Sequence, residues 1–227
     1  MKYHLNPRMG INPLCEYVYL SSASRRSTII KNAKEKPTFV VKRYNEAEDF
    51  LSYFLASKCD SKLLLEHIKS LRTGYYAKEF ERDCAHYSAD ALEGFFRNGL
   101  WLTGLMENYD LEVSLNQTTH KIIISGVQIS IRPELILYKK GTKERVGFLK
   151  LYISKTKPLE SHHGELVACL GKSYFLEEHT LNFHSDCCLV LDVFRGELIT
   201  APKAFKKRMS DITASCKEIA DRWDLVA

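Results

Sequence analysis

The chain has 227 residues, of which 45% are hydrophobic and 27% charged, and its formal net charge is +5. These are ordinary values for a soluble globular protein, and the length allows one large core or two small ones. No apolar run reaches the length of a membrane helix and no basic-then-apolar leader opens the chain, so we expect a cytoplasmic protein without a membrane partner. The seven cysteines are scattered and include no Cys-x-x-Cys pair, which predicts reduced thiols.

The N-terminal part of the chain is predicted to be helical. The Asn-Pro pair at 12–13 begins a short helix. Apolar residues at three- and four-residue spacing predict amphipathic helices over residues 39–55, after Asp60 as a capping residue, and over residues 88–102. We therefore expect a helical N-terminal region over residues 1–78.

Three strands are predicted next. Residues 122–124 are all isoleucine, and apolar and polar residues alternate over 127–132. This second strand is expected to continue past Pro133 to Tyr138, with a sheet edge or a bulge at the proline. The third strand is predicted over residues 146–154.

The C-terminal part is predicted to mix helices and strands. The pattern indicates a helix over 159–178, a nearly continuous apolar strand over 187–194, and a last amphipathic helix over 204–223. With the helix over 88–102, the predicted order is α-β-β-β-α-β. We expect an α/β (α+β) fold with a mixed sheet, in a domain that covers residues 79–227.

Glu134 and Lys150 are the candidate chemical groups. Glu134 follows Pro133 in one predicted strand, and Lys150 lies in the next. The two-residue period of a strand places Phe148, Lys150 and Tyr152 on one face. Carboxylates placed beside a lysine can hold a hard divalent cation, and the cation and the lysine can then activate a water molecule and stabilise a phosphate group. The other interpretation is that both residues are ordinary solvated strand residues.

This spacing and the element order resemble the core of the PD-(D/E)XK, or restriction-endonuclease-like, superfamily over residues 79–200. The resemblance implies a nuclease that uses Mg²⁺ or Mn²⁺, with Glu134 and Lys150 as catalytic residues and Glu134 as a metal ligand. The chain departs from the pattern because Phe148 occupies the second acidic position, two residues before the lysine. One carboxylate alone binds Mg²⁺ poorly.

An active site would need a replacement carboxylate from another element. Glu165 is the first choice, both as a catalytic residue and as a metal ligand, because its predicted helix follows the strand of Lys150. Glu93 is the second choice. The other interpretation of Glu165 is an acid near a helix N-terminus, where the helix dipole favours negative charge.

A second resemblance is to a bacterial protein family, and it implies an architecture without an activity. It covers the N-terminal part of the chain and the third predicted strand. The residues that carry it are Leu14-x-x-Tyr17, Ala23-Ser24-Arg25-Arg26, Pro37-Thr38-Phe39-x-x-x-Arg43-Tyr44, and the strings Gly147-x-x-Lys150 and Ser154-Lys155-Thr156-x-Pro158-Leu159.

Positive charge is concentrated in short segments. Residues 25–43 and residues 139–157 each contain seven basic residues and one acid. Such clusters are the usual footprint of phosphate-backbone binding, although solvated loops and helix faces have the same composition. The residues expected to contact DNA or RNA are Arg25, Arg26, Lys139, Lys140, Lys155 and Lys157.

Histidines 162, 163, 179 and 184 are close together in sequence and raise the question of a zinc site. The first pair and His179 lie at opposite ends of one predicted helix, about 25 Å apart at 1.5 Å per residue, so they cannot share one ion. No phosphate-binding glycine loop, dinucleotide-binding motif or hydrolase elbow occurs.

Three interpretations of function remain open. The first is a metal-dependent endonuclease that acts on DNA or RNA. The second is a catalytically inactive pseudo-nuclease without a cofactor, which binds DNA, RNA, a protein partner or a second copy of itself. The third is a small regulatory or defence-system interaction protein whose helical part docks a larger subunit. Phe148 favours the inactive interpretation slightly. The deciding feature is whether a second carboxylate lies near Glu134.

Overall fold

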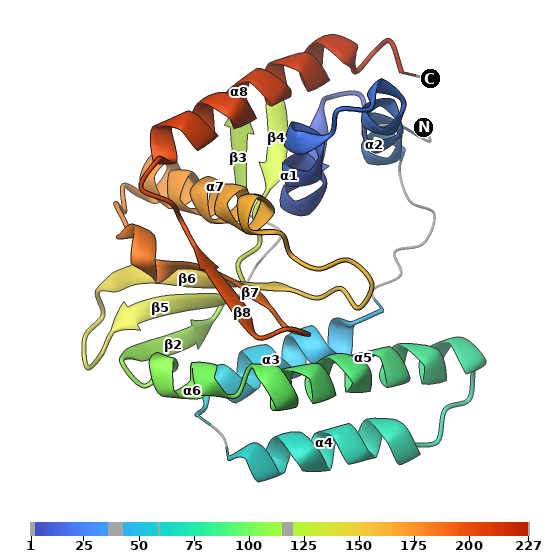
Figure 1. Ribbon diagram of the computed structural model, residues 1–227, viewed down its shortest axis with the longest axis vertical. Helices are drawn as coiled ribbons and strands as arrows, with labels where there is room; N and C mark the ends of the chain where they lie inside the picture. Colours follow the sequence, from blue (N-terminus) through green and yellow to red (C-terminus); the bar gives the residue numbers. More distant parts are fainter. Residues whose placement is uncertain (1–2, 36–42, 59, 115–119, 227) are drawn as a thin grey trace.

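The computed structural model describes residues 3–35, 43–58, 60–114 and 120–226 (Figure 1). Helices pack on both faces of a β-sheet, and a second, smaller sheet lies beside the helices of one face (Figure 1). The elements in chain order are β1 (Arg8–Gly10), α1 (Ile11–Tyr19), α2 (Ala23–Lys34), α3 (Asn45–Ala56), α4 (Ser61–Thr73), α5 (Glu79–Asn98), α6 (Trp101–Met106), β2 (Tyr109–Val113), β3 (Lys121–Ile124), β4 (Val127–Ser130), β5 (Leu135–Lys139), β6 (Arg145–Tyr152), α7 (Ser161–His179), the 3₁₀ turn η1 (Ser185–Cys187), β7 (Cys188–Asp192), β8 (Glu197–Thr200) and α8 (Phe205–Arg222).

The larger sheet has the strand order β2-β5-β6-β7-β8. Neighbours β2, β5 and β6 are antiparallel, β7 runs parallel to β6, and β8 is antiparallel to β7. The step from β6 to β7 passes through α7, because parallel neighbours need a crossover connection. The mixed α+β class predicted from the sequence is therefore confirmed. The elements α5, β2, β5, β6, α7 and β7 occur in the order α-β-β-β-α-β, with α6 after α5 and with β3 and β4 of the smaller sheet inserted between β2 and β5.

The smaller sheet has the order β1-β4-β3 and corrects one strand prediction. The prediction of a single strand from residue 127 to Tyr138 is wrong, because β4 ends at Ser130 and β5 begins at Leu135 in the other sheet. Arg132 lies between them with a φ of 50°. This left-handed conformation is uncommon for a residue with a Cβ atom and turns the chain out of the smaller sheet.

The first strand of the larger sheet is β2, which the sequence pattern did not reveal. The strand predicted over 122–124 is β3 and belongs to the smaller sheet. Strand β2 contains Asp110 and Glu112, and none of its residues is fully buried. It therefore lacks the apolar alternation by which a half-buried strand is recognised. The helix predicted over 88–102 is α5, which begins earlier, at Glu79, and ends at Asn98.

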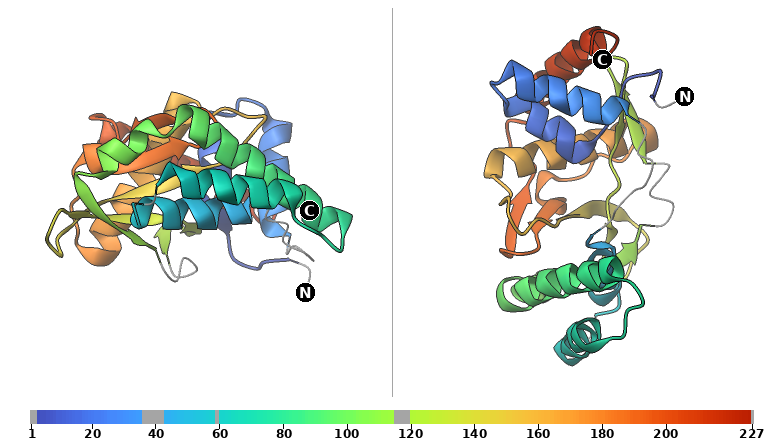
Figure 2. Two further views of the ribbon diagram at one scale, coloured as in Figure 1. Left: turned by 90° about the horizontal axis from the view of Figure 1, so that it is seen from below. Right: turned by 90° about the vertical axis from the view of Figure 1, so that its right-hand side faces the viewer.

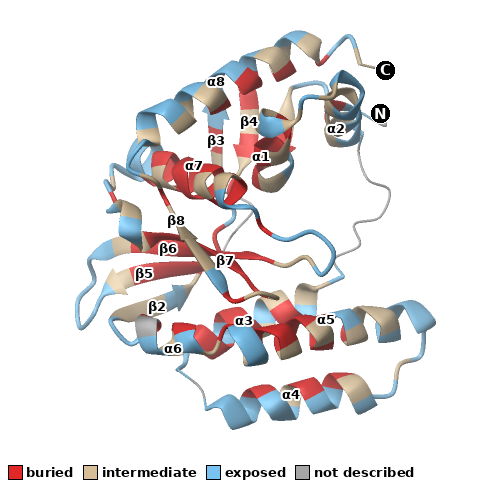
Figure 3. Ribbon diagram, viewed as in Figure 1, coloured by how far each residue is buried: buried red, intermediate tan, exposed pale blue. Residues whose placement is uncertain are grey.

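The larger sheet separates two hydrophobic cores (Figures 1 and 3). Phe148 and Tyr152 of β6 face the core formed with α1, α7, α8 and the smaller sheet. Leu149 and Leu151 face the core formed with α3, α4, α5 and α6. The alternation predicted for this strand is confirmed, and it places Lys150 on the side of α7.

The predicted N-terminal region divides between the two cores. Helix α1 contacts α7 and α8, whereas α3 contacts α5 and β2, and α4 packs on α5. Figure 2 shows α1 and α2 on one side of the larger sheet and α4 on the other. The domain boundary at residue 78 stays a prediction, and contacts between its two sides run through both cores.

Helix α7 lies close to the larger sheet because two glycines face it. Gly164 lies against Ile199 of β8, and Gly171 lies against the ring of Phe148. The two glycines are about two helical turns apart and therefore share one face of the helix. Phe148 is only 1% exposed, and its ring occupies the space that a side chain at position 171 would need.

We predict that Gly171→Ala destabilises the fold by about 1–3 kcal/mol, because the added methyl group overlaps the Phe148 ring and forces the core to repack. The matched control is Gly104→Ala in α6, where the added methyl group has no neighbouring atom within 4 Å. The control should be neutral or stabilise the fold by up to about 1 kcal/mol. Urea denaturation measures both changes, and equal stability of the two variants would contradict the described packing of α7.

Candidate functional site

Glu134 and Lys150 form an ion pair on neighbouring strands. Glu134 directly precedes β5, and its backbone N–H donates to the Leu149 carbonyl oxygen of β6 at 3.1 Å. The Lys150 ammonium donates to Oε1 of Glu134, and the backbone N–H of Leu151 donates to Oε2 at 2.5 Å. Both carboxylate oxygens are thus bonded to β6.

The pair is buried, and its surroundings change the proton affinity of the carboxyl group. Glu134 is 1% exposed and Lys150 is 9% exposed. Burial raises the pKa of Glu134, the charge of Lys150 opposes this, and the charge of Glu48 raises the pKa further. The resulting pKa lies above the usual range of a glutamic acid. Glu48 is therefore close enough to Glu134 for its negative charge to raise the Glu134 pKa.

A cavity of about 550 Å³ contains the pair. Glu48, Glu134 and Lys150 line it together with residues of β1, α1, α2 and β4. The strand period predicts that Glu134 and Lys150 face one common cleft, and the structure places both in this cavity. The remaining lining residues are Arg8, Met9, Gly10, Ile11, Asn12, Pro13, Glu16, Ile29, Asn32, Ala33, Gln128, Ser130, Ile131 and Arg132.

Phe148 lies in the hydrophobic core and does not line this cavity. Its ring stacks on Phe175 with the ring centroids 5.6 Å apart and also contacts Gly171. An acid at position 148 would therefore be buried among apolar side chains, where an unpaired carboxylate is strongly unfavourable. A second carboxylate for the site has to come from another element.

Glu165 is not brought to Glu134 and Lys150. Its Oε2 accepts hydrogen bonds from Nη2 and Nε of Arg208 in α8, at 2.6 and 2.9 Å. The reason lies in the orientation of α7. Because Gly164 faces the larger sheet, the next residue points about 100° around the helix, towards α8. The expected placement of Glu165 as a metal ligand beside Glu134 is thereby corrected.

Glu16 and Glu48 both line the cavity with Glu134, but the Glu16 carboxylate is paired with Lys157 at 2.9 Å, which leaves Glu48 as the candidate. Glu48 lies in the first turn of α3, next to the buried Ala47. Within the described chain its carboxylate forms no hydrogen bond or ion pair. Sequence reasoning missed Glu48 because an acid in the first turn of a helix is usually explained by the helix dipole.

The donor set of the cavity suits magnesium only in part. Within the described residues, no group of three or more His, Cys, Asp or Glu side chains is placed to hold a metal ion. Mg²⁺, however, is commonly bound by one or two carboxylates together with water and substrate phosphate oxygens. Glu48 and Glu134 supply two carboxylates to the lining of this cavity.

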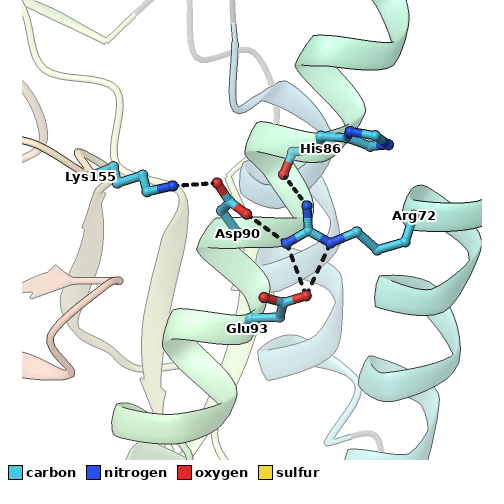
Figure 4. Close-up of polar contacts among 5 residues, drawn as sticks. All are labelled: Arg72, His86, Asp90, Glu93 and Lys155. Carbon is cyan, nitrogen blue, oxygen red and sulfur yellow. Dashed lines mark hydrogen bonds and ion pairs between the residues drawn. The ribbon is translucent and has the colours of Figure 1, made fainter.

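Arg72, Asp90, Glu93 and Lys155 form a network that connects α4, α5 and the segment after β6 (Figure 4). Lys155 donates to Asp90 at 2.8 Å, and Arg72 bonds both Asp90 and Glu93. Burial alone would raise the pKa of Asp90, but the bonds from Lys155 and Arg72 outweigh it and hold the pKa below its usual value. Glu93 is therefore engaged with Arg72 and is absent from the lining of the cavity.

Most basic residues expected to contact nucleic acid are bonded within the chain. Lys157 pairs with Glu16 at 2.9 Å, Arg26 pairs with Glu218 at 2.7 Å, and Lys140 donates to the Glu107 carbonyl oxygen at 2.7 Å. The ammonium of Lys139 lies 3.9 Å from a Glu144 oxygen. The Arg25 side chain forms no ion pair within the described residues. A nucleic-acid-binding role for these residues stays a prediction.

The clustered histidines have separate surroundings. His162 Nε2 lies 2.9 Å from Oε2 of Glu160, and His179 Nε2 lies 2.9 Å from the Tyr174 hydroxyl oxygen. His163 is buried, and its Nε2 finds no hydrogen-bond partner in the described chain. Burial lowers the pKa of His163 to about 4, so the ring is neutral near neutral pH.

We predict that His163 makes the stability pH-dependent. Its pKa is about 4 in the folded state and about 6.5 in the unfolded state, so the unfolded state binds protons more readily between these values. The free energy of unfolding should be highest above about pH 6.5 and fall by up to about 3 kcal/mol as the pH approaches 4. His163→Phe should flatten this slope, and the variant His162→Gln at the half-buried neighbour should keep it. Urea denaturation across this pH range measures the slope, and the same slope in His163→Phe and wild type would contradict the assignment.

Comparison of the chain with family models, with curated proteins and with solved structures gave no match. Across the described residues, every helix is too short or too polar to cross a membrane. The geometry of the cavity is therefore the basis for inferring a function.

Proposed function

We propose that this chain is a nucleic-acid-directed protein with a PD-(D/E)XK-nuclease-like site, in which Glu134, Lys150 and Glu48 act together on a phosphodiester. The observation that carries the proposal is the pairing of Glu134 with Lys150 on neighbouring strands inside a cavity that also contains Glu48. The α-β-β-β-α-β order of the surrounding elements supports it. The proposal includes a bacterial cytoplasmic setting and DNA or RNA as the substrate.

The roles of the three residues follow from their chemistry. Glu134 and Glu48 would hold Mg²⁺ or Mn²⁺, which in such sites supplies charge stabilisation to a phosphoryl oxygen. The Lys150 ammonium has three N–H donors and uses one on Glu134, so two remain for a phosphate oxygen. Because the lysine is only 9% exposed, little water competes for these donors.

A second candidate function is the catalytically inactive pseudo-nuclease, which binds DNA, RNA or a protein partner. The observation that favours it is that Lys150 and Leu151 already occupy both oxygens of Glu134. A metal ligand with both oxygens bonded elsewhere has to exchange a partner before it binds an ion. A regulatory role in a defence system and self-association belong to this alternative.

We predict Mg²⁺- or Mn²⁺-dependent cleavage of DNA or RNA that falls at least about 100-fold in Glu134→Gln, Lys150→Ala and Glu48→Gln. The matched control is Glu165→Gln, which removes an acid outside the cavity and should retain activity. Cleavage of end-labelled single strands and duplexes, with and without EDTA, measures the effect.

Folding has to be measured beside cleavage, because Lys150→Ala leaves a buried carboxylate without its cation and should itself destabilise the fold by about 3–5 kcal/mol. Glu48→Gln avoids this difficulty, since Glu48 is only half-buried and forms no ion pair within the described chain. Wild-type cleavage that survives Glu48→Gln and Glu134→Gln would refute the proposed catalytic site. No cleavage of any substrate, with tight binding retained, would support the pseudo-nuclease.

A further inference from the structure

One face of the smaller sheet forms a polar wall of the cavity. Along β4, Val127 and Ile129 are buried in the core, while Gln128 and Ser130 alternate with them. Strand β1 runs parallel to β4 with Arg8 paired to Gln128, and side chains of paired residues lie on the same face of a sheet. These polar residues line the cavity, as does Arg132 just beyond β4.

Arg8 and Arg132 bring positive charge to this wall that the protein does not neutralise. Within the described chain, neither guanidinium forms an ion pair or a hydrogen bond. Other arginines of the structure are paired, for example Arg208 with Glu165 at 2.6 Å and Arg72 with Asp90 at 2.5 Å. An unpaired guanidinium presents its planar set of donors to a ligand, a geometry that matches the oxygens of a phosphate.

Neutral polar groups accompany the two arginines. Ser130 Oγ is buried and has no hydrogen-bond partner in the described chain. The side-chain amides of Asn12, Asn32 and Gln128 line the same cavity and likewise make no hydrogen bond within the described residues. Amide and hydroxyl groups beside a guanidinium are suited to a ligand that carries sugar hydroxyls or base edges next to its phosphate.

The size of the cavity limits the form of the ligand. A volume of about 550 Å³ lies in the range of sites for small molecules, about 300–1,000 Å³. Glu134 and Lys150 are 1% and 9% exposed, so a phosphate that meets them has to enter the cavity, and a flexible single strand or strand end bends into it more readily than a paired duplex. Glu134 and Lys150 line the same cavity as the polar wall, so a strand that reaches them lies beside that wall.

We propose that Arg8 and Arg132 bind a phosphate group of a single-stranded nucleic acid, next to the phosphate that meets Lys150. The inference rests on the proposed function and specifies its substrate as a single strand or a strand end. Duplex DNA is then bound only where it is unpaired. The wall of the smaller sheet binds the neighbouring phosphate, and the proposed chemistry takes place at Glu134 and Lys150 of the larger sheet.

Binding in EDTA tests the inference without cleavage. Fluorescence anisotropy is measured with a labelled ten-nucleotide DNA, the RNA of the same sequence, and a blunt hairpin duplex. The wild type should bind a single strand at least about 10-fold more tightly than the duplex, and Arg8→Gln and Arg132→Gln should each weaken that binding by about 10-fold or more. The matched control is Arg97→Gln, an exposed arginine of α5 that is absent from the lining of the cavity.

Competition with unlabelled small molecules identifies which part of the nucleic acid binds to the polar wall. Displacement of the labelled strand by a nucleoside monophosphate, but not by inorganic phosphate at the same concentration, assigns the wall to a nucleotide. Displacement by both assigns it to the phosphate group alone. Equal binding of single strand and duplex, or single-strand binding that Arg8→Gln and Arg132→Gln leave unchanged, would overturn the inference.

These outcomes are separate from those of the cleavage assay. Metal-dependent cleavage that needs Glu48 and Glu134, together with unchanged binding in both arginine variants, would contradict the proposed role of the polar wall and support the proposed catalytic site. If the protein binds single strands through Arg8 and Arg132 but cleaves none of the substrates, the catalytic proposal is contradicted and the proposed role of the polar wall is supported.

Discussion

The buried ion pair between Glu134 and Lys150 is the interaction on which the site depends. A carboxylate that is only 1% exposed is unfavourable unless its charge is neutralised and its oxygens are hydrogen-bonded. Lys150 supplies the charge, and the Leu151 N–H supplies the second bond. The backbone of Glu134 also bonds to Leu149, so three consecutive residues of β6 hold this one glutamate. The start of β5 is therefore held firmly against the centre of the larger sheet.

The same glutamate marks the place where the chain passes from one sheet to the other. The chain leaves the smaller sheet after Ser130, turns at Arg132, and enters the larger sheet at Leu135. The cavity lies at this junction and collects residues from both sides of the structure. Glu48 comes from a helix of one core, whereas Arg8 belongs to the strands beside the other core. The junction, rather than any single element, brings the candidate groups together.

Charge compensation differs between the cavity and most of the basic residues that the sequence singled out for nucleic-acid binding. The basic segments that are prominent in the sequence are largely paired with carboxylates or carbonyl groups, as Lys155 and Lys157 are. A cation with a carboxylate beside it attracts a phosphate less strongly than an unpaired one. Arg8 and Arg132 are less conspicuous in the sequence, yet their guanidinium groups are unpaired within the described residues and face a cavity. Counts of basic residues therefore say less about a binding surface than the partners of each residue do.

The sequence by itself determined the α+β class, the helices α3, α7 and α8, the alternation along β6, and the joint placement of Glu134 and Lys150. These features follow from local periodicity, because residues two apart in a strand and three or four apart in a helix share a face whatever the rest of the chain does. Only the tertiary structure decided that the residues around Pro133 belong to two sheets, that Glu165 points to Arg208, and that Glu48 and Arg8 reach the cavity. Those outcomes depend on which distant segments pair and on how α7 is rotated by its glycines, and such contacts between residues far apart in the chain leave no periodic signal in the sequence.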